Sequence, residues 1–337
     1  MNLNLAPKVA VIIVNWNSGE LLKKSLCALQ EQKYPIREVI VVDNSSTDSS
    51  ATGLETYFSN IKVIRRNENI GFAAANNYGV KSVHESEWLA LLNPDAFPEP
   101  DWLARLIGAT QKFPGYSFFG CRMLKAGTPH ILDGVGDNYH ASGLVWRRGY
   151  GSGADNNYPD AGEVFSPCAA AALYRRDAFL DVGGFDEDFF CYVEDVDLGF
   201  RLRLAGHRCM LIPDAVVHHV GSACTGGQHS DFSVYHGHRN LVWTFIKNMP
   251  GVLFWALLPI HVLLNFVTVV YFAMHGQGKV ILRAKRDAIK GIPKMWRKRL
   301  EIQANRRASV MDIWRVLDKR LTPSRREKST QPKKGIL

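Results

Sequence analysis

Four short apolar runs, each followed by polar residues, dominate the first 95 positions of the sequence: Val9–Val14, Val39–Val42, Ile61–Ile64 and Leu89–Leu92. Runs of this length, bounded by turn residues, predict strands buried on both faces. The segments between them include Glu20–Gln32, in which apolar residues recur at helical spacing. Alternating strands and helices predict an α/β fold, with a Rossmann-like, mainly parallel sheet covered by helices on both faces.

Carboxylates follow two of these strands. Asp43 comes directly after the second strand, and Asp95 follows the fourth within the turn Asn93-Pro94-Asp95. The carboxyl ends of parallel strands share one edge of the sheet, where ligands bind in open α/β folds, so we expect both acids at one site. Asp43 suits the base or ribose of a nucleotide, and Asp95 suits Mg²⁺ or Mn²⁺ holding a diphosphate. The alternative is an ordinary turn that caps the fourth strand.

Two common phosphate-binding motifs are missing from the sequence. No G-x-G-x-x-G follows the first strand, and the chain has no Walker loop. Backbone amides of a glycine-rich loop therefore cannot be the main diphosphate contact. The sequence predicts that a metal ion takes this role.

The stretch Phe185–Arg201 carries six carboxylates among apolar and aromatic residues. Glu194 and Asp195 lie at the predicted start of a helix, where the helix dipole favours acids without any further role. The neighbouring aromatic residues should bury this region, however, and a buried carboxylate with a raised pKa suits a general base. Glu194 and Asp195 point about 100° apart on a helix, so only one can face a substrate squarely.

Two further residues are candidate ligands. His218 and His219 end a predicted strand and point to opposite faces, so at most one can join Asp95 on a metal. The other interpretation is a core or capping histidine. Arg239, near the start of a helix predicted from Tyr235, is either a cation for the diphosphate or an ordinary surface arginine.

Charge and cysteine content indicate a location. Residues 279–337 carry 19 Lys and Arg against 5 Asp and Glu, whereas the rest of the chain is mildly acidic. A basic tail indicates an anionic surface, and the body lacks a nucleic-acid face, so we expect a membrane surface as partner and no nucleic acid. The six cysteines form no C-x-x-C pair, and the N-terminus has no apolar signal core. We therefore expect buried free thiols in the cytoplasm.

Residues 250–278 contain no Asp, Glu, Lys or Arg. The apolar segment Gly251–Met274 is long enough to span a membrane. A span would carry the basic tail outside, against the positive-inside rule, and Pro259 would kink it. We therefore favour a kinked, re-entrant or interfacial helix with the tail on the cytoplasmic leaflet, with a true span and a buried helix as alternatives.

The predicted organisation follows from these segments. A nucleotide-binding α/β domain covers residues 1–245, a membrane-associated helix 246–278, a basic helical tail 279–321 and a disordered terminus 322–337. Within the domain, residues 115–159 show little periodicity and are interpreted as irregular. Cys209–Ile212 and Ala215–Val217 are predicted as two separate strands.

The motifs of the chain, and the order in which they occur, resemble those of the family 2 glycosyltransferases, which have the GT-A fold. The matching pieces are Val11–Asn17, Val41–Asp48, Asn69–Asn77, Leu92–Asp95, Gly184–Phe190 and Glu194–Arg201. Each piece is weak alone, but together they are specific and extend over roughly residues 9–245. Within the family the chain is most similar to bacterial rhamnosyltransferase-like members that build cell-surface polysaccharides.

The resemblance implies a role for each matched residue. Asp195 matches the base, with Glu194 as the acceptor contact. Asp95 matches the last acid of the family's D-x-D metal motif, whose first position is Asn93 here, and His219 matches the family's late histidine by its spacing to Ser222 and Thr225-Gly226. The residues expected to contact the donor, a dTDP- or UDP-sugar, are Asn15, Asp43, Asn69, Gly71, Asn77 and Arg239.

The implied reaction is inverting transfer of a sugar, with rhamnose favoured, to a lipid-linked or polysaccharide acceptor. The implied location is the cytoplasmic face of a bacterial inner membrane. A rival from another class is a catalytically silent membrane module that only binds a nucleotide sugar, because Asn93 replaces an acid. A nucleotidyltransferase is disfavoured, since the loop Asn15–Gly19 offers no cation.

Overall fold

The computed structural model describes residues 6–58, 60–154, 161–221, 227 and 229–320. The expectation of a disordered terminus over 322–337 falls outside these residues, as do the Ser222 and Thr225-Gly226 positions used to choose His219. The first half of the fold follows the predicted alternation. Its elements are β1 (Val9–Asn15), α1 (Glu20–Gln30), β2 (Glu38–Asp43), α2 (Leu54–Tyr57), β3 (Ile61–Arg65), α3 (Gly71–Lys81) and β4 (Trp88–Leu92).

The second half contains more strands than predicted. It comprises β5 (Ala96–Pro98), α4 (Trp102–Lys112), β6 (Phe118–Lys125), β7 (Thr128–Gly134), β8 (Asp137–Tyr139), β9 (Val145–Arg147), β10 (Gly162–Glu163), β11 (Ala171–Arg175), α5 (Arg176–Asp181), η2 (Glu187–Phe189), α6 (Glu194–Leu204), β12 (Cys209–His219), α7 (Asp231–Asn248), α8 (Gly251–Met274), α9 (Gly278–Ala304) and α10 (Val310–Val316).

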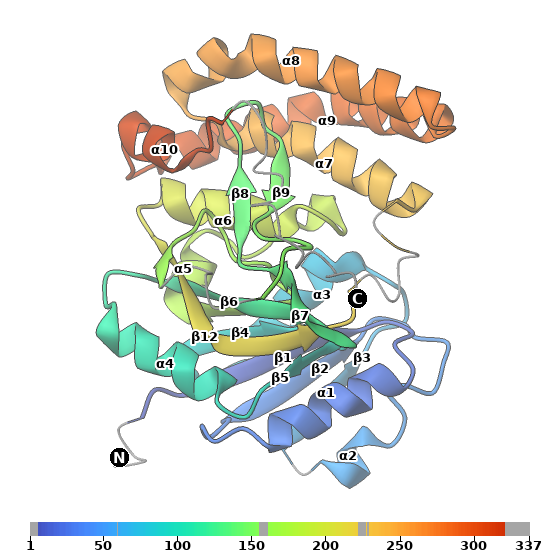
Figure 1. The fold of residues 1–337 in the computed structure, drawn as a ribbon, viewed down its shortest axis with the longest axis vertical. Helices are drawn as coiled ribbons and strands as arrows, with labels where there is room; N and C mark the ends of the chain where they lie inside the picture. Colours follow the sequence, from blue (N-terminus) through green and yellow to red (C-terminus); the bar gives the residue numbers. More distant parts are fainter. Residues whose placement is uncertain (1–5, 59, 155–160, 222–226, 228, 321–337) are drawn as a thin grey trace, which may run out of the picture.

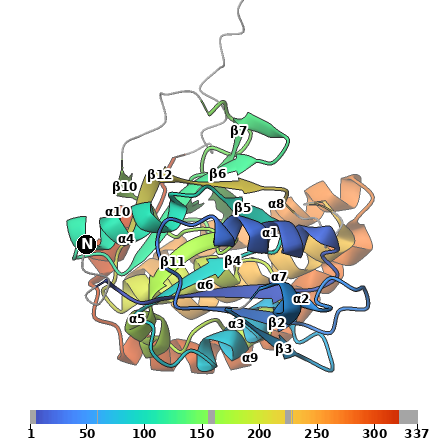
Figure 2. The same ribbon diagram turned by 90° about the horizontal axis from the view of Figure 1, so that it is seen from below.

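One mixed sheet organises the domain. Its main path runs β10-β12-β6-β11-β4-β1-β2-β3, with β5 paired to β12 and β7 to β6. The strands β4, β1, β2 and β3 are parallel, as predicted, whereas β11 is antiparallel to both of its neighbours. Buried side chains of α1 and α4 pack on one face, and those of α3, α5 and α6 on the other (Figure 1, Figure 2). The sheet with helices on both faces is thereby confirmed.

Three sequence interpretations were wrong. The irregular connection expected over 115–159 is wrong for the described residues 115–154, which contain β6 to β9. β7 pairs with β6 through register shifts, and β8 and β9 are only three residues long, so little periodicity is left in the sequence. The two strands expected over 209–217 are one strand, β12, with a bulge between Ile212 and Val216 that accommodates Pro213. The helix expected from Tyr235 begins at Asp231, where the side chain of Ser230 accepts a hydrogen bond from Ser233 N.

The helices α7, α8 and α9 form a separate layer above α6 (Figure 1). A third apolar cluster joins α6 to α7 and α9 through Phe200, Phe245 and Ala288, among others. Within the basic segment expected to be helical over 279–321, α9 packs against the rest of the protein through this cluster. The boundary expected at residue 245 lies inside α7.

The apolar helix α8 is long and apolar enough to cross a membrane, and little of it is buried. The helix continues through Pro259. Of the six cysteines, the five that the structure describes are free thiols, but Cys27 is exposed and Cys191 half-buried, so the expectation of burial holds for only part of the set.

Candidate active site

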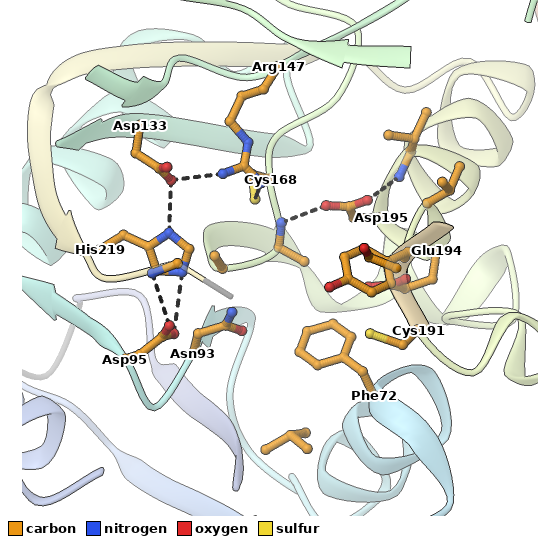
Figure 3. A pocket seen from close by; sticks show the side chains of 18 of the residues that line it. Phe72, Asn93, Asp95, Asp133, Arg147, Cys168, Cys191, Glu194, Asp195 and His219 are labelled. Carbon is orange, nitrogen blue, oxygen red and sulfur yellow. Dashed lines mark hydrogen bonds and ion pairs between the residues drawn. The ribbon is translucent and has the colours of Figure 1, made fainter. Parts of the chain in front are cut away.

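A cavity of about 1070 Å³ opens at the carboxyl edge of the parallel strands. It is lined by both candidate bases, by the three candidate metal ligands and by two of the candidate donor contacts, which are Glu194, Asp195, Asn93, Asp95, His219, Asn69 and Gly71. Asn15, Asp43, Asn77 and Arg239 are not among its lining residues. The side chains following Pro94 and those at the start of α6 therefore face one common space (Figure 3).

Asp95 and His219 meet on one side of this cavity. Asp95 Oδ1 lies 3.3 Å from His219 Nε2, and Asp95 Oδ2 accepts a hydrogen bond from Gly221 N at 3.1 Å. The other ring nitrogen of His219 lies 2.8 Å from Asp133 Oδ2. Burial disfavours the charged imidazole, but the two carboxylates outweigh burial and raise the pKa of His219 to about 9. His218 points to the other face of β12, toward Glu99, as the alternation of a strand requires.

Asn93 completes this side of the cavity. Its Oδ1 is buried and has no hydrogen-bond partner among the described residues. A buried carbonyl oxygen without a donor is costly unless a ligand satisfies it. Asn93 and Asp95 supply oxygen ligands and His219 a nitrogen, a donor set that suits Mn²⁺ or Mg²⁺. The residues present therefore fit the metal that the sequence predicts.

Arg147 connects the two sides of the cavity, and no pattern in the sequence indicated this role. Its Nη1 donates to Asp133 Oδ2 at 2.8 Å, and its Nη2 donates to Cys168 Sγ at 2.9 Å. Its Nε lies 3.8 Å from Asp137 Oδ1. Asp133 in turn orients His219, so a chain of contacts runs from Asp95 to the neighbourhood of Asp195 (Figure 3).

Asp195 and Glu194 lie opposite the metal ligands at the first turn of α6. Asp195 accepts hydrogen bonds from Ala169 N at 3.1 Å and from Val196 N at 2.9 Å. Burial raises the pKa of Asp195 despite these bonds and the nearby Arg147 cation. Burial, followed by the charge of Asp195, raises the pKa of Glu194 well above its usual value, and Glu194 Oε2 lacks a partner in the described chain. The two acids differ in their contacts: two backbone amides and the nearby Arg147 favour the ionised form of Asp195, whereas Glu194 has an oxygen without a partner among the described residues.

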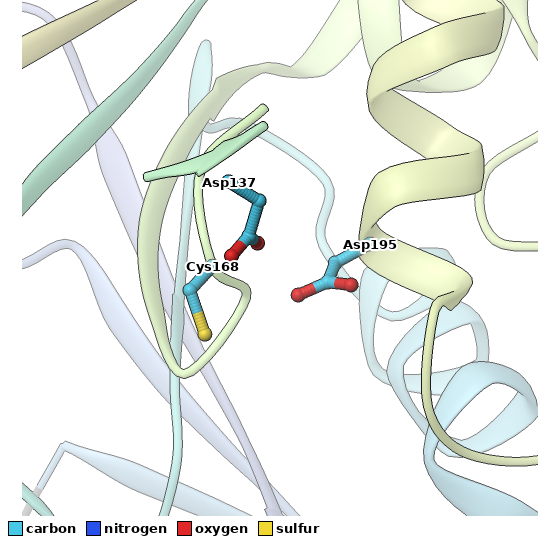
Figure 4. A group of neighbouring side chains, drawn as sticks. All are labelled: Asp137, Cys168 and Asp195. Carbon is cyan, nitrogen blue, oxygen red and sulfur yellow. The ribbon is translucent and has the colours of Figure 1, made fainter. Parts of the chain in front are cut away.

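Asp137, Cys168 and Asp195 form a compact group whose potential ligand atoms lie within 4.8 Å of one another (Figure 4). Burial and the charge of Asp195 raise the pKa of Asp137 to about 7. Burial also raises the pKa of the Cys168 thiol. The guanidinium of Arg147 already brings positive charge to these three residues. We therefore interpret the group as part of the electrostatic environment of Asp195 and not as a second metal centre.

The loop before α6 has an unusual backbone. Phe190, Tyr192 and Val193 all adopt positive φ angles between 65° and 69°. Such angles are unfavourable for side chains of this kind and need support from outside the loop. Asn240 of α7 gives that support, because its Nδ2 donates to the carbonyl oxygens of Phe189, Cys191 and Tyr192 at 2.7 to 3.0 Å.

Arg239 also supports this loop and does not line the cavity. Its Nη2 donates to the carbonyl oxygens of Asp188 and Phe189, and its guanidinium packs over the ring of Trp243. This geometry corrects the expectation of a diphosphate contact, since the guanidinium already satisfies backbone acceptors. Asn77 is likewise structural: it bonds Phe185 N and Phe185 O and thereby fixes the chain that leads to the loop.

The candidate nucleotide contacts lie at the carboxyl ends of β1 and β2, some of them lining the cavity and others behind its wall. Asn15 Nδ2 donates to Asp43 Oδ1 at 3.0 Å, which holds the ends of β1 and β2 together behind the rim. In front of them, Asn44 Nδ2 donates to Asn69 Oδ1 at 2.8 Å, and both asparagines line the cavity. Asn44 therefore lies where Asp43 was expected.

Gly71 shows why the first residue of α3 must be small. Its φ is 83°, and a Cβ at this position would come within 2.6 Å of the Phe190 ring. A glycine avoids both problems and lets the loop before α6 close onto α3. The sequence picked Gly71 as a donor contact, whereas the structure adds this packing role.

The comparisons agree with this architecture. The profile described as Glycosyl transferase family 2 matches residues 10–183, about half of the chain, so the chain belongs to this family and is a glycosyltransferase. The chain is 28% identical over 244 residues to an N-acetylglucosaminyl-diphospho-decaprenol L-rhamnosyltransferase of Mycobacterium tuberculosis; the match covers 64% of this chain and 77% of that protein.

Solved structures with low sequence identity share the fold. One is a mannosyltransferase of Pyrobaculum calidifontis in complex with GDP-Man and Mn²⁺, with a TM-score of 0.53 and 18% identity, covering 92% of this chain and 86% of that one. Another is S. aureus TarS 1–349 in complex with UDP-GlcNAc, with a TM-score of 0.53 and 19% identity, covering 91% of each chain. These similarities confirm the GT-A-like fold.

Proposed function

We propose that this glycosyltransferase moves a sugar, with inversion at the anomeric carbon, from a nucleoside-diphosphate donor to a hydroxyl group of a lipid-linked saccharide. The observation that carries the proposal is the common cavity lined by Asp95 and Asp195. The similarity to a rhamnosyltransferase that acts on a decaprenol-linked saccharide supports rhamnose as the sugar and the cytoplasmic face of a bacterial membrane as the location.

The donor end of the cavity suits a nucleoside diphosphate. Asn44 and Asn69 offer amide groups to a base or ribose, and Asp95, Asn93 and His219 would hold the divalent cation. The cation supplies positive charge that stabilises the departing diphosphate. Asp133 keeps the His219 ring oriented through Nδ1, so that its other nitrogen faces Asp95. The Mn²⁺ and GDP-mannose bound by a protein of similar fold support this assignment.

The acceptor end of the cavity suits a general base. Asp195, whose ionised form is favoured by two backbone amides and by Arg147, takes the proton from the acceptor hydroxyl. The new bond forms between this oxygen and the anomeric carbon while the bond to the diphosphate breaks on the opposite side. Glu194, held protonated, can donate a hydrogen bond to the acceptor. The Cys168 thiol has a raised pKa and is no thiolate nucleophile, so a direct displacement accounts best for the site.

An Asp195→Asn variant tests the assignment of the base. It should lose sugar transfer by about a thousandfold or more and keep donor binding within about twofold, because Asp195 faces the acceptor and not the metal. Donor binding is measured by thermal shift with Mn²⁺, and transfer by product formation. Wild-type turnover in this variant would remove Asp195 from the mechanism.

A second measurement separates the enzyme from a silent binding module. Mn²⁺-dependent hydrolysis of a nucleotide sugar without acceptor should occur in the wild-type protein if the site is active. Binding of the donor without hydrolysis or transfer, for every acceptor supplied, would favour the silent module. A panel of dTDP-, UDP- and GDP-sugars in the thermal-shift assay identifies the donor, because a bound ligand raises the melting temperature.

A further inference from the structure

The helix α8 exposes an almost continuous apolar surface. Val252 and Met274, near its two ends, are 73% and 79% exposed. Between them the large apolar side chains that are more than one third exposed are Trp255, Ile260, Val262, Leu263, Phe266, Val267, Val270 and Tyr271. A contiguous apolar surface of this size on a folded protein indicates a partner.

The opposite face of α8 is fixed to the protein along most of its length. Phe254 packs near Trp296 of α9, with ring centroids 5.6 Å apart. In the middle, His261 Nδ1 lies 2.8 Å from Ser142 O, and Lys285 Nζ donates to Asn265 Oδ1 at 2.6 Å. The polar residues His261 and Asn265 therefore hold α8 against the body and against α9.

The helix α9 runs back beside α8 (Figure 1). Leu282, Ile289 and Trp296 recur every seven residues, are exposed and lie on one face of α9. The buried stripe of α9, which includes Ile281 and Ala288, is next to this face.

Cations border the exposed apolar stripe of α9. At about 100° per residue, these cations lie on the side of the exposed apolar stripe that is away from the buried stripe of α9. These exposed cations are Lys279, Arg286, Lys290 and Arg297. An apolar stripe bordered by cations is the pattern of a helix lying at the surface of an anionic membrane.

This arrangement is incompatible with a span of α8. The helix has 24 residues, about 36 Å, and a membrane-crossing α8 would take the neighbouring α9 with its cations into the hydrocarbon. Cations at that depth are strongly unfavourable. We propose that α8 and α9 lie together in the plane of an anionic phospholipid bilayer, with the apolar surface among the acyl chains and the border of cations at the phosphates.

The turn between α8 and α9 joins this surface to the cavity. Gln277 Nε2 in the turn donates to His229 O and to Asp231 Oδ1. His229 lines the cavity, as does Phe232 in the first turn of α7. An amphiphilic acceptor held by its lipid in the bilayer can therefore present its head group at this rim. This last step rests on the proposed function, whereas the docking of the bilayer does not.

Vesicle binding by the full chain tests the surface. Wild-type protein should co-sediment with vesicles of phosphatidylcholine and phosphatidylglycerol and bind pure phosphatidylcholine more weakly. Phe266→Glu should lower binding by about tenfold or more, and Lys290→Glu by about fivefold or more. The matched controls are Leu180→Glu, an exposed apolar residue of α5, and Lys62→Glu, an exposed lysine of β3, which should bind as wild type does.

A labelling experiment decides between the two orientations. In inside-out membrane vesicles, a cysteine just beyond α8, Lys279→Cys, should react with a membrane-impermeant maleimide as readily as the exposed Cys27 of the body, with both sites located by peptide mass spectrometry. Reaction at Cys27 and not at residue 279 would mean a span and overturn the proposal. A dimer that Phe266→Glu dissociates, without vesicle binding by wild type, would assign the surface to a second copy and also overturn it.

Donor hydrolysis in detergent separates this proposal from the proposed function. Phe266→Glu should hydrolyse the donor at the wild-type rate, because Phe266 is remote in sequence and structure from every residue that lines the cavity. Hydrolysis without vesicle binding by wild type would refute the membrane surface alone. Vesicle binding without hydrolysis or transfer would refute the proposed function alone.

Discussion

The side-chain amide of Asn240 donates to the carbonyl oxygen of Tyr192 at 2.7 Å, two residues before the pair Glu194–Asp195. The same amide reaches two further carbonyl oxygens of this loop, in which three non-glycine residues have positive φ angles. One side chain of α7 therefore stabilises a backbone that would otherwise relax. The position of Asp195 depends on this contact.

Asn240→Ala should lower kcat by about tenfold or more, because a displacement of the base by a fraction of an ångström disrupts its alignment. Donor affinity should change little, since the donor end of the cavity lies on other elements. Steady-state kinetics and thermal shift separate the two effects. Thr244→Ala, one turn later on α7, is the control: Thr244 bonds only within the helix. Equal losses of activity in both variants would indicate general damage to α7.

The pH dependence of sugar transfer should follow the ionisation of the buried carboxyl group of Asp195. Only ionised Asp195 can accept a proton, and burial raises its pKa, so the acid limb of kcat/KM should lie above the usual aspartate range near 3.9. Arg147 favours the ionised form. Arg147→Gln should therefore move the acid limb to higher pH, whereas Arg147→Lys, which keeps the charge, should move it less. A limb that moves to lower pH in Arg147→Gln would contradict this electrostatic role.

The affinity of the site for Mn²⁺ should depend on the number of anionic ligands that it contains. Asn93→Asp adds an anionic oxygen beside Asp95 and should lower the Mn²⁺ concentration needed for half-maximal donor hydrolysis by about tenfold. Asp95→Asn should raise that concentration by at least as much. Calorimetric titration of Mn²⁺ into the protein with bound nucleoside diphosphate gives a reading that does not depend on turnover. Unchanged Mn²⁺ affinity in both variants would place the metal elsewhere.

A buried ion network between α7 and α6 should dominate stability at neutral pH. Lys247 Nζ lies 2.5 Å from Asp186 and 2.8 Å from Asp197, and all three side chains are nearly inaccessible. Burial lowers the pKa of Lys247, but its two carboxylate partners oppose the shift and keep the ammonium charged. Lys247→Met leaves both carboxylates without this cation and should lower the free energy of unfolding by about 3–5 kcal/mol in urea denaturation.

The pH dependence of this loss has a definite sign. Burial disfavours the charged form of Asp186, but Lys247 and Lys298 outweigh it and hold its pKa below the usual range. A lowered pKa in the folded state stabilises the protein above the unfolded value, near 3.9, and this stabilisation disappears as the pH falls further. The difference between wild type and Lys247→Met should therefore shrink below about pH 4. A difference that grows in acid would refute the network.

The sequence was sufficient for the features whose signal is local. The strands that end at Asp43 and just before Asn93 are short apolar runs with polar turns, and their shared edge follows from parallel pairing. The helix at Glu194 was recognisable from its acids and its apolar spacing. These elements carry Asp95 and Asp195, and the structure brings both acids to one cavity.

The sequence was insufficient where the site depends on short or irregular strands. Asp133, Asp137 and Arg147 come from β7, β8 and β9: β7 pairs with β6 through register shifts, and β8 and β9 have three residues each, too few for an alternating pattern. Nothing in their spacing indicates that Arg147 will reach Cys168. The prediction that Arg239 contacts the diphosphate was wrong because the sequence does not show the hydrogen-bond partners of a side chain. The guanidinium of Arg239 donates to the backbone carbonyl oxygens of Asp188 and Phe189.

The contact of Asn240 with the loop and that of Lys298 with Asp186 and Asp188 have a practical consequence. A recombinant fragment trimmed before α8 to improve solubility would discard α9, and one trimmed at residue 183, where the family match ends, would discard α6 with Asp195 and α7 as well. Both fragments would keep β1 to β4, but the first would lose the contacts of Lys298 and the second the proton acceptor itself. Ligand binding by either fragment would then be a misleading guide to its competence as a catalyst.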